Sequence, residues 1–243
     1  NSITIASSED KNFNYIPKNY SLENNIDYFH VTSNNTIFGT QIKNFYNGDI
    51  PLACDMSSDI FSRKINIEDF DLIYAGAQKN MGPAGTTLYI CKKEIFGKSS
   101  VPIPTMLDLK IHSDKDSMFN TPPVFPIYAS MLNLRWLKRV GGLSYIEEQN
   151  EKKSKLIYNQ IDNSSLFLGT ANKEDRSSMN VTFTLTNEGL NETFNKMLVE
   201  ANINGLKGHR SVGGFRASMY NAMPFESVSI LVDIMKELEN KKG

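Results

Sequence analysis

The sequence predicts an α/β fold, with a mainly parallel sheet that has helices on both faces, followed by a smaller α+β C-terminal domain. Short apolar runs in the first half end in glycine, proline or small polar residues, which is typical of buried strands. Strand, crossover and strand succeed one another there, as in a parallel sheet covered by helices. The second half holds longer segments with helical spacing between fewer strands. We expect one domain over residues 1–138 and a smaller one over 139–243.

Four apolar runs of the first half are expected to be strands. They cover residues 28–32, 50–55, 72–77 and 86–91. Ile3, Ile5 and Ala6 form a further candidate strand near the start of the sequence. Residues 99–126 are rich in proline and show no periodicity, and loops of that length are usually functional or disordered. The sequence therefore predicts a long loop between the sheet and the helices that follow.

The second half is expected to form helices and two strands. The segments with helical spacing are 127–140, 143–162, 190–201 and 224–236. The expected strands are 178–186, in which apolar residues alternate, and 216–220. Glycines interrupt the pattern between residues 205 and 216, and this segment carries His209, Arg210 and Arg216. Two arginines and a histidine among glycines favour anion binding, and the alternative is a solvated loop.

The composition describes a globular chain without bulk charge. The 243 residues are 40% hydrophobic and 22% charged, with a net charge of -1. No long run of one sign occurs, which argues against a nucleic acid or a membrane surface as partner. No apolar stretch has the length of a membrane span, and no signal-peptide pattern is present. Cys54 and Cys91 lie in apolar runs and are interpreted as buried free thiols, so we expect the cytoplasm.

Several kinds of site lack their sequence pattern. The three histidines lie far apart and the two cysteines are not paired, so no metal site is predicted. The sequence has no G-x-S-x-G nucleophile motif. It also has no phosphate-binding or dinucleotide-binding glycine pattern after a predicted strand.

One lysine and one aspartate carry the strongest chemical signal. Asp55 ends the run 50–55, and Lys79 follows the run 72–77. Parallel strands would bring both side chains to the same carboxyl edge, where open α/β sheets bind ligands. A lysine held there among small and polar residues is placed to act as a neutral amine. Such an amine forms an imine with a carbonyl or with pyridoxal phosphate, whose ring nitrogen an aspartate keeps protonated. The alternative for Lys79 is a solvated loop end.

Four sequence blocks are highly specific in combination. They are Cys54-Asp55-Met56-Ser57-Ser58, Tyr74-Ala75-Gly76-Ala77-Gln78-Lys79-Asn80-Met81-Gly82-Pro83-Ala84-Gly85, Phe119-Asn120-Thr121-Pro122-Pro123 and Gly208-His209-Arg210-Ser211-Val212-Gly213-Gly214-Phe215-Arg216-Ala217-Ser218. In content, order and spacing they resemble the phosphoserine aminotransferase family of class-V, fold-type-I enzymes that use pyridoxal 5'-phosphate. The resemblance covers essentially all of the 243 residues. The family's usual N-terminal segment is lacking, so residues 1–138 resemble the C-terminal part of its large cofactor-binding domain.

The resemblance implies a cofactor site. Lys79 would be catalytic and hold the cofactor as an aldimine, and Asp55 would pair with the pyridinium nitrogen. Gln78 and Ser57 would lie near the cofactor's phosphate or ring. Thr36 matches a family threonine that contacts the cofactor, although the residue before it is asparagine where the family has glutamate.

The resemblance also implies the substrate contacts and the assembly. Asn120 and Thr121 match a pair that reaches into the neighbouring subunit and binds its cofactor phosphate, which implies an obligate homodimer with shared sites. His209 and Arg210 match residues that bind the substrate phosphate. Arg216 matches the arginine that grips the substrate α-carboxylate, for which a planar bidentate fork is suited.

The implied reaction belongs to serine biosynthesis. It moves the amino group of L-glutamate to 3-phosphohydroxypyruvate, giving O-phospho-L-serine and 2-oxoglutarate. Use of a phosphorylated threonine analogue, as in pyridoxine biosynthesis, stays open.

Two alternatives stay open at the level of sequence. The family's N-terminal part supplies an aromatic ring that stacks on the pyridine, a Gly-Arg turn and a further substrate arginine, and none of these can be assigned here. One alternative is therefore a non-catalytic dimerising or ligand-binding module of the same fold. The other is a related fold-type-I enzyme, such as a serine–glyoxylate aminotransferase or a cysteine desulfurase. The pair His209 and Arg210 argues against such a relative.

Overall fold

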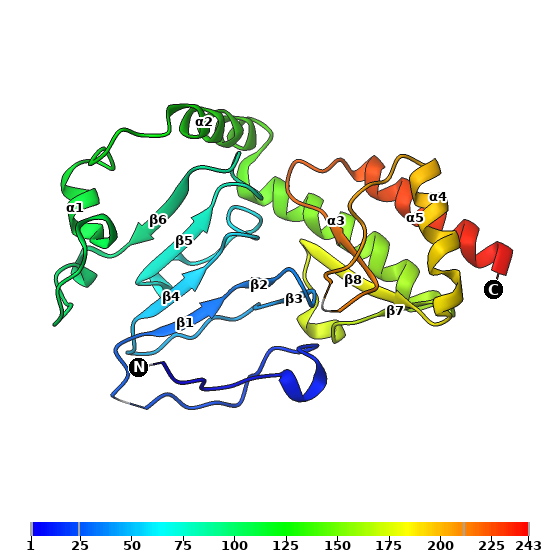
Figure 1. The fold of residues 1–243 in the computed structure, drawn as a ribbon, viewed down its shortest axis with the longest axis horizontal. Helices are drawn as coiled ribbons and strands as arrows, with labels where there is room; N and C mark the ends of the chain where they lie inside the picture. The colour runs from blue at the N-terminus through cyan, green and yellow to red at the C-terminus, as the bar shows by residue number, and fades with distance from the viewer. Residues whose placement is uncertain (1, 24, 211, 243) are drawn as a thin grey trace.

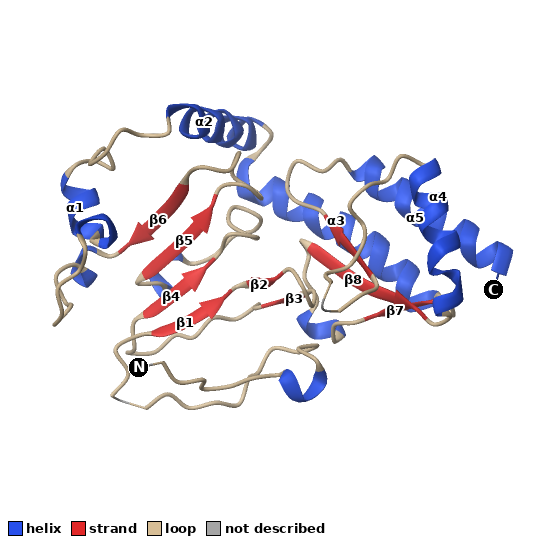
Figure 2. Ribbon diagram, in the orientation of Figure 1, coloured by secondary structure: helices blue, strands red, loops and turns tan. Residues whose placement is uncertain are grey.

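The computed structural model describes residues 2–23, 25–210 and 212–242 (Figure 1). Ser211, which belongs to the fourth sequence block, lies outside the described residues. The chain forms a larger sheet at one end and a smaller sheet with long helices at the other, as the colouring by secondary structure shows (Figure 2).

The larger sheet is mainly parallel. Its strands, in spatial order, are β1 (Phe29–Thr32), β4 (Leu52–Asp55), β5 (Leu72–Gly76) and β6 (Thr87–Cys91). The β1–β4 and β4–β5 pairs are parallel and the β5–β6 pair is antiparallel. All four strands were expected from the apolar runs. The connection between β5 and β6 is a short turn segment, which is why β6 returns in the opposite direction.

The two faces of the larger sheet differ. On one face apolar side chains such as Leu52, Cys54 and Ile73 are buried, with Ile60 and Phe70 of the β4–β5 crossover packed on them. This crossover consists of turns and a 3₁₀ helix rather than an α-helix. The opposite face carries polar and aromatic residues that are exposed or partly exposed. The helices α1 (Leu109–Asp114) and α2 (Val124–Arg139) lie on the β6 side of the sheet (Figure 1).

The C-terminal part has the predicted α+β character. Its antiparallel sheet consists of β7 (Phe167–Gly169), β8 (Asn180–Leu185) and β9 (Phe215–Ser218). Its helices are α3 (Gly142–Asn163), α4 (Asn191–Glu200) and α5 (Phe225–Lys242). Apolar side chains from all of these elements form one buried cluster. This cluster shares no residue with the cluster under the larger sheet.

A small hairpin connects the two parts. Its strands are β2 (Asn34–Asn35) and β3 (Thr40–Gln41). Asn34 Nδ2 donates to Asn180 Oδ1 of β8 at 2.8 Å, and Thr182 Oγ1 donates to the Phe38 carbonyl at 2.9 Å. The hairpin that follows β1 is therefore hydrogen-bonded to the smaller sheet.

Some local expectations were wrong. Ile3, Ile5 and Ala6 lie in no strand. The segment 99–126 contains the short helix α1, whose start is capped by Asp108 accepting from the Lys110 amide. Cys91 is only partly buried, although Cys54 is buried as expected, and both thiols are free. Short 3₁₀ helices were not expected, and they lie at Glu9–Lys11, Ile67–Asp69, Lys93–Ile95, Thr105–Leu107, Lys173–Asp175 and Glu188–Leu190.

Within the described ranges, no helix combines the length and the apolar character that crossing a bilayer requires.

Candidate active site

The open face of the larger sheet carries a row of four polar or aromatic side chains. The strand register places Thr32 opposite Asp55, Asp55 opposite Tyr74, and Tyr74 opposite Tyr89. Neighbouring side chains in such a row lie about 5 Å apart at Cβ. The row therefore sets Asp55 between a hydroxyl and a phenol, close to the carboxyl ends of β4 and β5.

Asp55 is held at the end of β4 by the backbone that follows it. Its Oδ1 accepts from the Ser57 amide at 2.8 Å, and Ser57 Oγ accepts from the Gly76 amide at 3.1 Å. Ser57 thus joins the carboxyl ends of β4 and β5. Its hydroxyl keeps one proton to donate, so the predicted role towards a cofactor is compatible with this contact.

Lys79 lies in a tight turn just after β5. The amides of Met81 and Gly82 both donate to the Ala77 carbonyl, at 3.0 and 2.7 Å, which closes the turn around Lys79. Burial lowers the pKa of the Lys79 amine, the nearby Asp55 carboxylate raises it, and the Arg216 guanidinium lowers it. Asp55, Lys79 and Arg216, all three predicted from the sequence as site residues, therefore lie near enough for the two charges to act on the Lys79 amine.

Gln78, also a predicted site residue, is exposed and folds back over Gly76. A Cβ atom at Gly76 would lie 2.6 Å from Gln78 Oε1, so a larger residue there would require the Gln78 side chain to move. The glycine that ends β5 thus leaves the space that the Gln78 carboxamide occupies.

Tyr74 was not predicted as a site residue. Its hydroxyl is 3.0 Å from His30 Nε2. Burial raises the pKa of Tyr74, and the neighbouring Asp55 carboxylate adds to that effect. His30 is exposed on the open face. Strand alternation was the signal that could have found Tyr74, since it places this residue on the same face as Asp55.

Arg216 lies in β9 and reaches towards the hairpin. Its Nη1 donates to the Thr36 carbonyl at 3.1 Å. Its Nε is buried and has no hydrogen-bond partner among the described residues. Thr36 is thereby brought beside Arg216 through its backbone. The unpartnered N–H leaves the guanidinium able to bind an anion.

The glycine-rich segment between Leu206 and Arg216 forms a closed loop. The Arg216 amide donates to the Leu206 carbonyl at 2.7 Å, and the Gly208 amide donates to the Gly214 carbonyl at 2.8 Å. A Cβ atom at Gly208 would lie 1.9 Å from the Gly213 carbonyl oxygen, so only glycine fits there. The loop carries His209, which is partly buried, and Arg210, which is exposed.

Asn120 and Thr121 are exposed on the segment before α2. Asn120 Nδ2 donates to the Thr121 carbonyl at 3.2 Å. In the described part of the chain, no hydrogen bond joins either residue to Asp55, Lys79 or Arg216. The predicted pair is thus available on the surface of this chain and not gathered at its own sheet edge.

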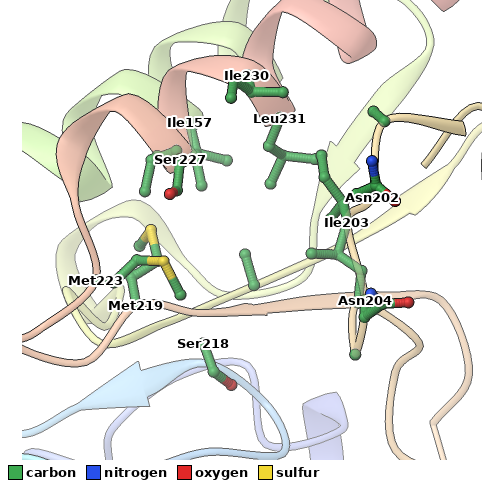
Figure 3. Close-up of a pocket in the computed structure, with 15 residues that line it drawn as sticks. Ile157, Asn202, Ile203, Asn204, Ser218, Met219, Met223, Ser227, Ile230 and Leu231 are labelled. Carbon is green, nitrogen blue, oxygen red and sulfur yellow. The ribbon is translucent and has the colours of Figure 1, made fainter. Parts of the chain in front are cut away.

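A separate cavity of about 350 Å³ lies in the C-terminal part (Figure 3). Ile157, Ile203 and Leu231 are among the residues that line it, and none of its lining residues is ionisable. It therefore lacks the acid–base groups that the sheet edge provides. No group of three or more metal-ligating side chains occurs among the residues that the structure describes.

Comparison with known proteins gives consistent results. A model of the class-V aminotransferase family matches residues 4–231. The phosphoserine aminotransferase of Flavobacterium psychrophilum is 63% identical over 98% of this chain and 67% of its own length. The chain thus spans about two thirds of the length of that relative.

Two of the solved structures that resemble this one illustrate the likeness. The phosphoserine aminotransferase from Bacillus circulans subsp. alkalophilus has a TM-score of 0.96 and 44% identity, over 99% of this chain and 68% of that one. The phosphoserine aminotransferase from Trichomonas vaginalis, solved with pyridoxal phosphate bound, has a TM-score of 0.85 and 36% identity, over 89% of this chain and 62% of that one. The predicted fold class is therefore confirmed.

Proposed function

The chain belongs to the class-V aminotransferase family, and from that premise we propose that it moves the amino group of L-glutamate to 3-phosphohydroxypyruvate. The products are O-phospho-L-serine and 2-oxoglutarate, and the role is in serine biosynthesis. One observation carries the proposal. Asp55 at the end of β4, Lys79 in the turn after β5 and Arg216 of β9 lie near enough to one another that the charges of Asp55 and Arg216 both act on the Lys79 amine.

The cofactor of this family is pyridoxal phosphate, and the donor set at the sheet edge fits it. When bound, the cofactor supplies an aldehyde for condensation with an amine and a ring that takes up electrons from the substrate carbon. Lys79 offers an amine whose pKa burial lowers, and Asp55 offers a carboxylate in the same site. We assign Lys79 Nζ to the aldehyde and Asp55 to the ring nitrogen. The negative charge of the carboxylate would favour the protonated form of that nitrogen.

Lys79 would also serve as the acid–base group of the site. A partly buried amine with a lowered pKa is neutral over a wider pH range, so it can accept the proton that leaves the substrate α-carbon. The position of Asp55 across the same edge limits how far the pKa falls, because its negative charge favours the ammonium form. The pKa of the Lys79 amine is thus lowered by burial and by Arg216, and raised by Asp55.

Arg216 is assigned to the substrate α-carboxylate. Its buried Nε has no partner among the described residues, and a planar guanidinium binds a carboxylate through two parallel hydrogen bonds. His209 and Arg210, on the closed loop before β9, are assigned to the substrate phosphate. Gln78, Ser57 and Thr36 are assigned to the cofactor's immediate surroundings.

A homodimer with shared sites is the proposed assembly, and an apolar surface supports it. Large apolar side chains are exposed along 101–132: Val101, Ile103, Met106, Leu107, Met118, Phe119, Val124, Phe125, Ile127, Tyr128 and Leu132. A surface of this kind usually marks a protein interface. Asn120 and Thr121 lie within it, where they would reach a partner's cofactor phosphate. Sedimentation of Phe125→Asp should show monomers, and Leu168→Asp, at an exposed apolar residue of β7, should stay dimeric.

The proposed domain boundary lies between residues 138 and 139, next to the end of α2 at Arg139. The two separate apolar clusters, one under the larger sheet and one in the C-terminal part, support this division. Each proposed domain thus has a hydrophobic core of its own, which is what defines a domain.

A cytoplasmic location is proposed, because both cysteines are free thiols. The thiols also argue against a desulfurase. Burial raises the pKa of Cys54 to about 12 and also raises the pKa of Cys91, so neither forms the thiolate nucleophile that such an enzyme needs.

The deciding experiment is a visible absorption spectrum of the intact protein with pyridoxal phosphate, for the wild type and for Lys79→Ala. We expect an imine band in the wild type only, and a loss of transamination on the order of 10⁴-fold in the variant. A band in both proteins, or in neither, would contradict the role of Lys79. Bleaching by L-alanine but not by O-phosphoserine would contradict the substrate assignment.

A further inference from the structure

Three buried asparagines lie between the turn that holds Lys79 and the strand that carries Arg216. Asn80 follows Lys79 directly, Asn221 lies in the turn after β9, and Asn150 lies in α3. Their exposed fractions are 5%, 6% and 1%. A buried amide is costly unless it is hydrogen-bonded, so three at one junction indicate a geometric requirement there. We call Asn80, Asn150 and Asn221 the asparagine relay.

Hydrogen bonds link the relay in sequence. The backbone amide of Asn221 donates to Asn80 Oδ1 at 3.0 Å, and Asn150 Nδ2 donates to Asn221 Oδ1 at 2.9 Å. Asn221 Nδ2 donates to the Phe61 carbonyl at 2.9 Å, and Asn150 Nδ2 to the Ser62 carbonyl at 3.1 Å. The relay thus connects the lysine turn, the β4–β5 crossover, α3 and the end of β9.

Both ends of the relay are fixed by further contacts. Asn133 Nδ2 of α2 donates to the Asn80 and Met81 carbonyls, at 2.9 Å each. Lys153 of α3, which is 1% exposed, donates to the Tyr220 carbonyl at 3.0 Å and to the Met223 carbonyl at 3.1 Å. The backbone on either side of Asn80 and Asn221 therefore has little freedom to move.

The catalytic groups themselves lie on two different bodies. Lys79 and Asp55 belong to the larger sheet and Arg216 to the smaller one, and the apolar clusters of the two are separate. Between Lys79 and Arg216 the chain runs through β6, α1, α2, α3, β7, β8 and α4, so chain connectivity alone does not fix the distance between the two side chains. Directed hydrogen bonds across the junction fix geometry in a way that apolar packing does not.

We propose that the asparagine relay is a positioning device that sets the distance between the Lys79 amine and the Arg216 guanidinium, so that a carboxylate held by Arg216 presents its α-carbon to Lys79. This proposal rests on the proposed function, which assigns the carboxylate to Arg216. The relay residues touch neither the substrate nor the cofactor; they act through the two groups that do. The relay should therefore matter for substrate binding and much less for holding the cofactor, because Lys79 and Asp55, the residues assigned to its aldehyde and ring nitrogen, both belong to the larger sheet and its following turn.

The test compares Asn80→Ala with Val232→Ala in the intact protein. Asn80→Ala removes the Oδ1 that accepts from the Asn221 backbone amide, so it cuts the bond between the lysine turn and the end of β9. Val232 is 2% exposed in the C-terminal core, so its truncation weakens the fold without touching the junction. For each protein, absorbance titrations give the dissociation constants of pyridoxal phosphate and of L-glutamate, and kinetics separate kcat from KM. We expect Asn80→Ala to weaken L-glutamate binding about tenfold and cofactor binding less than about threefold. Val232→Ala should change both constants less than about twofold.

The outcomes separate this proposal from the proposed function. If both variants weaken L-glutamate binding equally, or if Asn80→Ala leaves it unchanged, the relay only supports the fold and the proposal is overturned. Arg216→Lys is measured in parallel. If that variant binds L-glutamate normally, the assignment of Arg216 is what fails. Should Asn80→Ala not fold, Asn150→Leu, which removes the bonds from α3 to Asn221 and to Ser62, is judged against the same control and the same thresholds.

Discussion

The two sheets of the molecule differ in how much of their surface is packed with apolar side chains. In the C-terminal part, Phe194 and Phe183 are 0% exposed and Phe167 and Phe215 are 3% exposed. Phe194 packs on the other three rings, with centroids 4.9 to 6.4 Å away. The larger sheet has apolar packing on one face only and keeps Asp55 and Tyr74 on the other. Stability is thus concentrated in one part and chemistry at the edge of the other.

This difference separates two kinds of substitution. Changes in the phenylalanine cluster should lower the free energy of unfolding and spare the site. Changes on the open face should do the reverse, because those side chains are exposed and bury little apolar surface. Enzymes often separate the two in this way, since groups kept available for chemistry rarely contribute to stability.

The largest effect is expected from Phe194→Ala. Removing this ring from the centre of the cluster leaves a cavity and should cost about 3–5 kcal/mol of unfolding free energy. Urea unfolding gives that value, and activity per folded molecule should stay within about twofold. A loss of activity without a loss of stability would show that the cluster and the site are not separate.

A smaller effect is expected from Lys153, the buried lysine of α3. Burial lowers its pKa from 10.5 to about 8. Below about pH 8 both folded and unfolded chains hold the proton, whereas between about 8 and 10.5 only the unfolded chain does. Stability should therefore rise with pH across that window relative to Lys153→Met, by roughly 3 kcal/mol at most.

Unfolding of wild type and variant at a series of pH values measures this difference. Lys155→Met serves as the matched control, because Lys155 is an exposed lysine of the same helix. If the difference between wild type and Lys153→Met is flat from pH 8 to 10.5, the buried lysine keeps an ordinary pKa and the interpretation is wrong.

Much of the fold could be predicted from sequence because its elements have long, regular patterns. The helix expected over 143–162 is α3 (Gly142–Asn163), and the strand expected over 178–186 contains β8 (Asn180–Leu185). The strands β2, β3 and β7 have two or three residues each, and so short a segment shows no periodicity. They form because of partners that lie far away in the sequence.

Within the site, too, some features could be predicted from local sequence and others depend on residues far away in the chain. Asp55 and Lys79 could be predicted because each follows an apolar strand, and parallel strands bring their ends together. The contact between Arg216 and Thr36 joins positions 180 residues apart, and no local pattern indicates it. The asparagine relay had no local signal either, since a single asparagine in a sequence is most often a surface residue.

The smallest effect is expected from Tyr74→Phe, on the open face. The change removes the hydroxyl that contacts His30 and leaves the aromatic ring, so it creates no cavity. Because Tyr74 is partly exposed, water can replace its hydrogen bonds, and the unfolding free energy should change by less than about 1 kcal/mol. The hydroxyl also lies beside Asp55, so pyridoxal phosphate binding should weaken measurably but less than about fivefold. Tyr89→Phe, the next residue in the row, should leave both quantities unchanged. A stability loss larger than the loss of cofactor affinity would mean that the open face helps to hold the sheet together, and the contrast between the two sheets would no longer hold.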